Sequence, residues 1–583
     1  MQDHLSDSPL PNHYSIFFLV MRRLRAPLIV LIIIMAVSVF GLTLIPGVDQ
    51  DGNPDYLSLF HAFYFISYTA TTIGFGELPH TFSNEQRLWV MFCIYLSVIG
   101  WAYMLGSLFS LMGDRHLQQA VHLHRFILAV RRLKEPFYLV CGYGETGRLV
   151  CRGLDMLGHR TIVIDKNADR ISLLLMNTDA GDVPALTADV MNPETLQFAG
   201  LTKRECLGVL ALTDNDQANL AVAITARLLA PSLLAFCRAE TRETAANMAS
   251  FSTGHIINPF WTFGGYLNLA LTAPGAWRLI TWLTGQAGKT VESCRTPSLG
   301  EWIICGHGRF GREVSDALKA EGISITIIDR EPSSGISIRW IQGEATGEEA
   351  LTQAGVQTAA GILAGTRDDV ENLSIAVTAR QLNPDIFIVV RQNAYSNQAL
   401  FNAFKSDMMV VPSEIVAKEC LTILSTPLLP LFLEEIRKQD DEWNMRILDR
   451  MTKRFAQQAP LVWSECINMK HAPALYRRVM NGEKITLGTV LSSPANRYEA
   501  LQCEVLYLVR DRGEPILVPA SDTALKPGDR LLLAGRPSAR DELDLTLTNA
   551  NALNYVQTGE DLPGGLVWEY FSRRRKAART KAG

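Results

Sequence analysis

Two uncharged apolar runs near the N-terminus dominate the hydropathy pattern of this 583-residue chain. The first covers residues 26–44 and the second residues 88–112, 19 and 25 residues respectively. An α-helix needs roughly 20 apolar residues to cross the hydrocarbon core of a bilayer. Residues 56–69 are aromatic and apolar but too short to span, which predicts a re-entrant helix buried within protein. The pattern therefore predicts a membrane hairpin over residues 26–112.

A secretory signal is an alternative interpretation of the first run, because basic residues precede it. The small-residue cleavage site of such a signal is missing, and a second apolar run follows. Both observations favour a membrane span.

From Pro136 the pattern changes to short apolar strands that alternate with amphipathic stretches. The strand F-Y-L-V-C (137–141) runs into G-Y-G-E-T-G (142–147), and T-I-V-I-D then ends at Asp165. A strand, a G-x-G-x-x-G turn, a helix and an acid-terminated second strand form the dinucleotide-binding fingerprint. Its glycines allow a tight turn and close approach of phosphate, which the N-terminus of the helix faces.

The same order of elements recurs. E-W-I-I-C (301–305) runs into G-H-G-R-F-G (306–311), and I-T-I-I-D ends at Asp329, offset from Asp165 by 164 residues. Two copies, each with strand, glycine turn, helix and acid, predict two α/β Rossmann-like domains.

A second matching segment supports this repeat. Residues 213–227 match residues 366–380 at an offset of 153 residues. The same offset relates Pro231/Pro384, Arg238/Arg391, Pro259/Pro412 and Pro274/Pro427. The first copy therefore carries extra residues between Asp165 and Thr213.

The predicted fold class is a membrane α-helical hairpin followed by two α/β Rossmann-like domains and a β-rich C-terminal lobe, for which C-E-V-L-Y-L-V-R (503–510) and L-K-P-G-D-R-L-L-L-A-G (525–535) supply strands. The expected domain boundaries are 1–25 (N-terminus), 26–112 (transmembrane domain), 113–135 (linker), 136–299 (first domain), 300–545 (second domain, with the lobe at about 485–540) and 546–583 (tail).

Composition agrees with a small membrane part joined to a large soluble part. Mean hydropathy is +0.09 although 20% of the residues are charged. The net charge of -4 and the pI near 6.3 give no indication of a nucleic-acid partner. The ten cysteines include no C-x-x-C pair, which argues against a zinc site or disulfide framework and favours a reducing compartment.

Charged residues around the two apolar runs predict their orientation. The loop between the runs has one basic residue, Arg87, against the acids Asp49, Asp51, Asp55, Glu77 and Glu85. Basic residues flank the outer ends instead: Arg22, Arg23, Arg25, Arg115, Arg125, Arg131, Arg132 and Lys134. Because basic residues stay on the cytoplasmic side, both termini are predicted to be cytoplasmic in a multi-pass protein of the cell (inner or plasma) membrane.

The segment T-A-T-T-I-G-F-G-E (69–77) lies between the predicted re-entrant helix and the second run. It resembles the T-V-G-Y-G selectivity filter of potassium channels through Thr72, Ile73, Gly74, Phe75 and Gly76. The resemblance implies that the backbone carbonyls of residues 72–75 replace the water shell of a permeant K⁺ ion. Alternating glycines suit this arrangement, because side chains resist the backbone angles it requires. Phe75 lacks the hydroxyl that braces the filter of that family.

A pore hairpin followed by tandem Rossmann-like units resembles channels with RCK domains, the regulators of potassium conductance. The resemblance covers about residues 26–540 and implies a homotetramer in the lipid bilayer with a gating ring of eight RCK domains. It places helical crossovers near 258–282 and 412–436. Gly100 and Gly106 stand where related channels use a gating hinge, although helix packing through small residues is an equal alternative.

The two fingerprints predict a nucleotide cleft in each domain. The predicted cleft residues are Gly142, Tyr143, Gly144, Glu145, Thr146, Gly147, Asp165, Lys166, Gly306, His307, Gly308, Arg309, Phe310, Gly311, Asp329 and Arg330. The two aspartates favour an unphosphorylated ribose, hence NAD(H) or an adenine nucleotide as regulatory ligand, although the cation after each is placed to hold a 2′-phosphate. Arg309 favours nucleotide binding in the second copy, whereas Glu145 opposes it in the first. Retention of the glycines for packing alone stays an alternative for each cleft.

Some RCK channels are opened by Ca²⁺, which needs several converging carboxylates. The tight acidic pairs here are Asp214 with Asp216 and Asp368 with Asp369. Neither pair resembles a calcium loop, and acids at helix N-termini explain both.

These features predict a tetrameric, K⁺-selective, ligand-gated channel and not an enzyme. A membrane-anchored NAD-dependent enzyme is one alternative, but it needs a catalytic domain for which the repeat leaves no room. A subunit of a K⁺ uptake transporter is another, but such systems separate degenerate filters from their RCK subunits.

Overall fold

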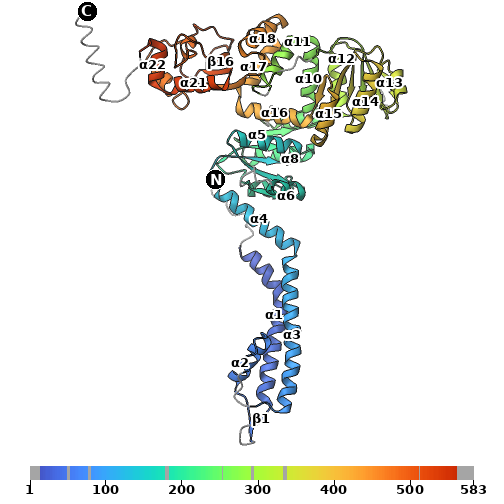
Figure 1. Cartoon of the computed structure of the whole chain (residues 1–583), viewed down its shortest axis with the longest axis vertical. Helices are drawn as coiled ribbons and strands as arrows, with labels where there is room; N and C mark the ends of the chain where they lie inside the picture. The colour runs from blue at the N-terminus through green and yellow to red at the C-terminus, as the bar shows by residue number, and fades with distance from the viewer. Residues whose placement is uncertain are drawn as a thin grey trace, which may run out of the picture. The chain divides into compact units, whose positions relative to one another are not determined.

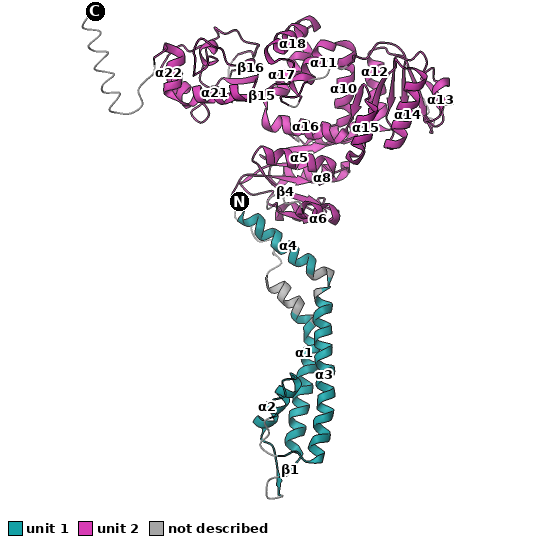
Figure 2. Cartoon of the chain, in the orientation of Figure 1, with its two compact units in different colours: residues 1–134 teal, residues 135–583 magenta. Residues whose placement is uncertain are grey.

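The computed structural model of the chain (Figure 1) describes residues 13–48, 53–76, 81–176, 183–251, 254–285, 287–290, 295–331, 338–510 and 513–560. The chain forms two compact units, residues 1–134 and residues 135–583 (Figure 2). Asp49, Asp51 and Glu77 of the acidic loop lie outside the described residues, as do the ends of the chain before residue 13 and after residue 560.

The first unit is built on two long helices, α1 (His13–Leu44) and α3 (Asn84–Met112), with α2 (Leu59–Ala70) beside them (Figure 1). Each long helix contains a stretch apolar enough to cross a membrane, 21 residues over Leu24–Leu44 and 28 over Asn84–Leu111. The 12 residues of α2 rise only about 18 Å, short of the roughly 30 Å of hydrocarbon. The predicted hairpin with a short intervening helix is confirmed.

Hydrogen bonds tie the end of α1 to the start of α3. Ser83 caps α3 in a reciprocal capping box with Gln86. The Gln86 side chain is fully buried, and its Nε2 donates to the Ile45 carbonyl at 3.0 Å. The Ser83 hydroxyl donates to the Pro46 carbonyl, also at 3.0 Å. The remaining elements of this unit are β1 (Gly47–Val48), β2 (Pro54–Asp55) and α4 (Arg115–Arg132).

The second unit begins with a six-stranded parallel sheet in the order β5-β4-β3-β6-β7-β8. Its strands are β3 (Phe137–Cys141), β4 (Arg160–Asp165), β5 (Ala185–Thr187), β6 (Cys206–Ala211), β7 (Leu234–Arg238) and β8 (His255–Ile257). Its helices are α5 (Glu145–Met156), α6 (Ala168–Met176), α7 (Pro193–Phe198), α8 (Asp216–Leu229) and α9 (Arg242–Ser250). All five residues of β3 are buried, because helices cover both faces of a parallel sheet.

A second parallel sheet repeats this topology in the order β11-β10-β9-β12-β13-β14. Its strands are β9 (Trp302–Cys305), β10 (Ile325–Asp329), β11 (Arg339–Gln342), β12 (Gly361–Ala364), β13 (Phe387–Arg391) and β14 (Met408–Val410). Its helices are α12 (Arg309–Ala320), α13 (Glu348–Gln353), α14 (Asp369–Leu382) and α15 (Gln398–Phe404), with a 3₁₀ turn at Tyr395–Asn397. Both sheets have the strand order of a Rossmann fold, and the two predicted α/β domains are confirmed.

The helix that follows each Rossmann-like domain in the chain packs on the other domain (Figure 1). The connecting helices are α10 (Pro259–Thr272), α11 (Pro274–Leu283), α16 (Pro412–Ser425) and α17 (Leu428–Lys438). Helix α10 buries Phe260 and Phe263 in the core of the second sheet, beside Phe310. Helix α16 reciprocally buries Val416 and Cys420 in the core of the first sheet. The apolar character of α16 and α17, which form a pair bent by 111°, therefore serves packing within this unit.

The C-terminal lobe is built on an antiparallel sheet in the order β15-β18-β16-β17. Its strands are β15 (Leu461–Cys466), β16 (Cys503–Val509), β17 (Ile516–Leu517) and β18 (Arg530–Gly535). Its helices are α18 (Asp441–Phe455), α19 (Pro473–Met480), α20 (Leu487–Val490), α21 (Pro537–Thr548) and α22 (Ala550–Thr558). Strand β15 pairs with β18 but lies before residue 485, where the lobe was expected to begin.

Candidate functional site

The pore segment leaves α2 at Thr71 and runs through the five predicted filter residues. Thr72, Gly74 and Gly76 have φ values of 63°, 65° and 73°, while Ile73 and Phe75 between them have negative φ. An alternation in the sign of φ turns successive N–H groups to one side of the chain and successive carbonyls to the other. Such a backbone presents a row of carbonyl oxygens, which is the arrangement that coordinates a dehydrated cation.

Hydrogen bonds show on which side of this segment its N–H groups lie. The N–H groups of Ile73 and Gly74 donate to the Tyr68 carbonyl at 3.0 and 3.3 Å, and that of Thr72 donates to the Thr69 carbonyl at 3.1 Å. The N–H groups therefore turn back to the end of α2. The Phe75 ring meets the Tyr68 ring edge to face, with centroids 5.9 Å apart.

The two predicted hinge glycines of α3 differ in their surroundings. A Cβ on Gly100 would lie 2.8 Å from Cδ1 of Ile34, so Gly100 allows α1 and α3 to approach closely. A Cβ on Gly106 would meet nothing within 4 Å. Gly100 thus has a packing role in this conformation, whereas no described residue packs against the corresponding face of Gly106.

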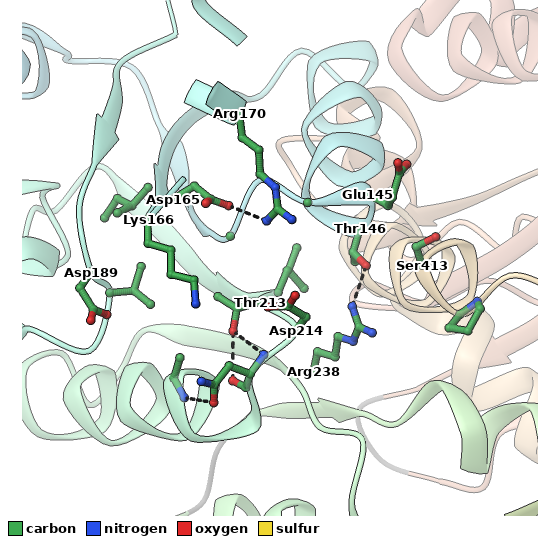
Figure 3. A pocket seen from close by; sticks show the side chains of 18 of the residues that line it. Glu145, Thr146, Asp165, Lys166, Arg170, Asp189, Thr213, Asp214, Arg238 and Ser413 are labelled. Carbon is green, nitrogen blue, oxygen red and sulfur yellow. Dashed lines mark hydrogen bonds and ion pairs between the residues drawn. The ribbon is translucent and has the colours of Figure 1, made fainter. Parts of the chain in front are cut away.

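The first cleft is a cavity of about 270 Å³ between the β3–α5 turn and the end of β4 (Figure 3). A Cβ on Gly147 would lie 2.0 Å from the Gly142 carbonyl oxygen, so only glycine allows α5 to start this close to the turn. Because α5 has no side-chain cap at Gly144, its first N–H groups remain available to a ligand in the cleft.

Asp165 organises the first cleft from the end of β4. The residue is 4% exposed, and its carboxylate accepts from the N–H groups of Tyr143 at 2.6 Å and Asn167 at 2.7 Å. Arg170 of α6 also donates to it at 3.4 Å. Figure 3 shows Lys166, Arg170 and Arg238 around the cavity, the last donating to the Thr146 hydroxyl at 3.2 Å.

The second cleft, at Gly306 and Gly308, is a cavity of about 450 Å³. Asp329 lies at the end of β10 and accepts from the His307 N–H at 2.5 Å, as Asp165 accepts from Tyr143. Arg330, which follows it, is held by Glu371 at 2.5 Å and by Glu344 at 3.4 Å. This cation is therefore already paired with carboxylates.

The structure brings only part of each predicted residue set to a cavity. The lining includes Gly142, Gly144, Glu145, Thr146, Asp165 and Lys166 in the first cleft, and Gly306, Gly308, Arg309, Asp329 and Arg330 in the second. Tyr143 packs against the core of the first sheet instead. His307 is buried against Trp340, and burial lowers its pKa. Phe310 is buried beside Phe260, and Gly147 and Gly311 act through the turn.

A carboxylate between the clefts changes the expected charge balance. Glu240, buried after β7, pairs with Arg238 at 2.5 Å and with Arg309 at 2.7 Å. Arg309 is therefore engaged across the two copies. Glu145 pairs with Arg148 at 2.9 Å on the surface of α5. The expected advantage of the second cleft rested on a free Arg309, which the structure does not provide.

Three of the four acids in the tight pairs have structural partners, and the fourth, Asp214, lines the first cleft. Asp368 caps α14, and Asp216 accepts from the N–H groups of Glu240 and Thr241. Asp369 accepts from the N–H group of Asn393 at 2.6 Å. Among the described residues no group of three or more His, Cys, Asp or Glu side chains is placed to hold a metal ion.

Sequence reasoning assigned no role to three cleft arginines. Arg170 lies 3.4 Å from Asp165, and Arg238 and Arg391 line the cavities from the ends of β7 and β13. Arg238 and Arg391 occupy matching positions in the two copies of the repeat, and this match is the sequence signal that could have pointed to them as cleft residues. Arg170 carries no such mark, because the position 164 residues later is Ser334 and not an arginine.

Comparison with known protein families agrees with this architecture. Residues 28–113 match a family described as an ion channel, and residues 138–259 and 302–412 match the TrkA-N domain. The first match covers the hairpin, and the other two cover the Rossmann-like domains.

Relatives with assigned names are similar to parts of the chain. A probable potassium channel protein 2 from Methanocaldococcus jannaschii is 25% identical over 239 residues, 40% of this chain and 64% of that protein. A Trk system potassium uptake protein TrkA homolog from Pyrococcus horikoshii is 32% identical over 136 residues, 21% of this chain and 60% of that protein. The chain thus spans less than two thirds of either relative. A solved structure described as "GsuK channel bound to NAD" has a TM-score of 0.43 and 17% identity, covering 91% of this chain and 99% of that one.

Proposed function

We propose that this chain, which combines an ion-channel domain with two TrkA-N domains, forms a K⁺-selective channel gated by a nucleotide. The observation that carries the proposal is the alternating sign of φ over residues 72–76, which presents a row of carbonyls between two potential membrane spans. One such segment cannot surround an ion, so four identical chains are required around one pore. Both termini then lie in the cytoplasm of a cell-membrane protein, and the acidic loop faces outward.

The cytoplasmic ligand proposed is NAD(H) or an adenine nucleotide. Each cleft offers an aspartate at the end of the second strand and a helix N-terminus without a side-chain cap. These features suit ribose hydroxyls and phosphate respectively. Four chains would bring eight such domains together in one ring. The ligand gates the pore to the extent that it binds the open and closed rings differently, and about 1–3 kcal/mol of coupling suffices.

Currents through purified full-length protein in planar bilayers test this function. K⁺ currents are expected, with reversal potentials showing preference for K⁺ over Na⁺, and open probability is expected to change when NAD⁺, NADH or ADP reaches the cytoplasmic face. The proposal fails if no K⁺ current appears under any of these nucleotides.

Asp165→Asn is expected to raise the nucleotide concentration for half-maximal gating by roughly tenfold at the first cleft, because the amide accepts ribose hydrogen bonds without a charge. Asp189→Asn is the matched control, since Asp189 lines the same cavity and makes the same charge change away from the end of β4. Equal shifts in the two dose–response curves would indicate general electrostatics instead of ribose recognition.

Phe75→Tyr is expected to keep the preference for K⁺ over Na⁺, because backbone carbonyls and not this ring coordinate the ion. The Phe75 ring is exposed in the single chain and meets the Tyr68 ring in a T-shaped contact. Bi-ionic reversal potentials measure the outcome. A loss of selectivity would show that the ring itself holds the filter.

A further inference from the structure

Arg391 lies where the two clefts meet. It is the last residue of β13, and it lines both the first cleft at Gly142 and the second cleft at Gly306. Among the residues of the described ranges, it is the one that lines both cavities.

The guanidinium of Arg391 lies against aromatic rings and forms no ion pair with any carboxylate in the described ranges. It lies 5.0 Å from the ring centre of Phe260 and 5.5 Å from that of Phe310. Its Nε atom is shielded from solvent and meets no hydrogen-bond acceptor among the described residues. A partly buried cation that has no paired anion is in an unfavourable state, which an incoming anion relieves.

The charges around Arg391 make its unpaired state still less favourable. Burial lowers the pKa of Arg391 to about 10, and the charges of Arg367, Arg309 and Arg238 act in the same direction. Glu240 is the carboxylate that opposes them, but it is already shared between Arg238 and Arg309. The junction of the clefts therefore holds more positive than negative charge.

The repeat shows how this asymmetry arises. Arg238 occupies the position that matches Arg391, and Glu240 follows it by two residues. The residue two positions after Arg391 is the neutral Asn393, whose side-chain amide and N–H group both donate to Asp369. The carboxylate that neutralises one arginine thus has no counterpart beside the other.

We propose that Arg391 is an anion receptor shared by the two clefts. A phosphate group bound in one cleft contacts the guanidinium, which is then no longer available to a phosphate group in the other cleft. This inference rests on the proposed nucleotide binding. A guanidinium forms its strongest contacts with a phosphate as a planar two-pronged fork. Two phosphates at one guanidinium would also repel each other. The second nucleotide on a chain is therefore expected to bind roughly tenfold or more weakly than the first.

The test compares calorimetric isotherms of ADP binding to the full-length protein in detergent or nanodiscs. Gly144→Leu blocks the first cleft and Gly308→Leu blocks the second. Neither glycine has a positive φ, and among the described residues a Cβ there meets the Arg170 side chain at 3.5 Å in the first case and nothing within 4 Å in the second. Each blocked protein is expected to bind one ADP per chain tightly. The wild-type protein is expected to bind less ADP, at concentrations below saturation, than the sum of the amounts bound by the two blocked proteins.

Arg391→Gln is expected to weaken ADP binding roughly tenfold in each blocked protein and to restore additivity to the chain with both clefts open. Arg446→Gln removes an exposed charge on α18 and is the matched control. It should change neither the affinity for ADP nor the additivity of the isotherms. The additivity comparison needs no Arg391 variant, so it decides the question even if that variant does not fold.

Two results would overturn the shared receptor: a wild-type isotherm equal to the sum of the blocked ones, or an Arg391→Gln effect on one cleft alone. Both leave nucleotide binding itself intact. An absence of ADP and NAD(H) binding in the wild-type protein would instead overturn the nucleotide proposal, and the shared receptor with it.

Discussion

Replacing Gly74 by alanine is expected to abolish K⁺ current while the protein still reaches the membrane. Gly74 has a φ of 65°, a conformation that costs an alanine about 1–2 kcal/mol in each chain. No described atom lies within 4 Å of a Cβ added there, so the effect is expected to act through the backbone and not through packing. An alanine that relaxes to negative φ breaks the alternation and turns a carbonyl out of the row. Bilayer recordings of the purified variant measure the loss.

Gly265→Ala provides the matched control for this experiment. Gly265 lies within α10, has no positive φ, and an added Cβ there also meets nothing within 4 Å. Alanine is favoured over glycine in a helix, so this variant should conduct as the wild type does. Wild-type K⁺ current in Gly74→Ala would contradict the proposed filter.

Gly311→Ala is expected to lower the free energy of unfolding of the second Rossmann-like domain by about 3 kcal/mol, which is at the upper end of the usual cost of overpacking. The added Cβ would lie 2.0 Å from the Gly306 carbonyl oxygen, a rigid backbone atom that cannot move without opening the β9–α12 turn. Gly147→Ala makes the same contact with Gly142 in the first domain. For domains of this size the expected fall in Tm is roughly 6–12 °C. Thermal unfolding of the full chain measures it.

Gly308→Ala separates this clash from a general effect of removing a motif glycine. Gly308 belongs to the same loop, has no positive φ, and has nothing within 4 Å of an added Cβ. Its Tm should stay close to that of the wild type. If Gly308→Ala and Gly311→Ala lowered the Tm equally, the close approach of α12 to the turn would not be the cause.

The elements of the fold were predictable because their signals are local. The two membrane helices follow from uncharged runs of sufficient length, and α2 follows from an apolar stretch that is too short to span. The strands β3 and β9 run into glycine turns that only a few backbone conformations satisfy. The repeat then made the second domain a copy of the first.

The lining of the clefts was only partly predictable. Every residue of the two glycine-rich strings was a candidate, but Tyr143 and His307 turn toward the sheet cores. Side-chain direction at these positions depends on the packing of the sheet and not on the motif. Arg170, Arg238 and Arg391 reach the cavities from other strands and helices, so no spacing within the motif identifies them.

The two spans, the glycine turns, the acids at the strand ends and the duplication follow from the amino-acid sequence alone, because chain length, hydropathy and backbone freedom act within a few residues. The folded chain was needed to show that α10 packs on the second core and α16 on the first. The structure also shows that Glu240 holds Arg309, and that Arg391 lines both clefts with no ion-paired carboxylate among the described residues. These pairings join residues about 70 to 250 positions apart, and they depend on which buried surfaces fit together across the whole unit.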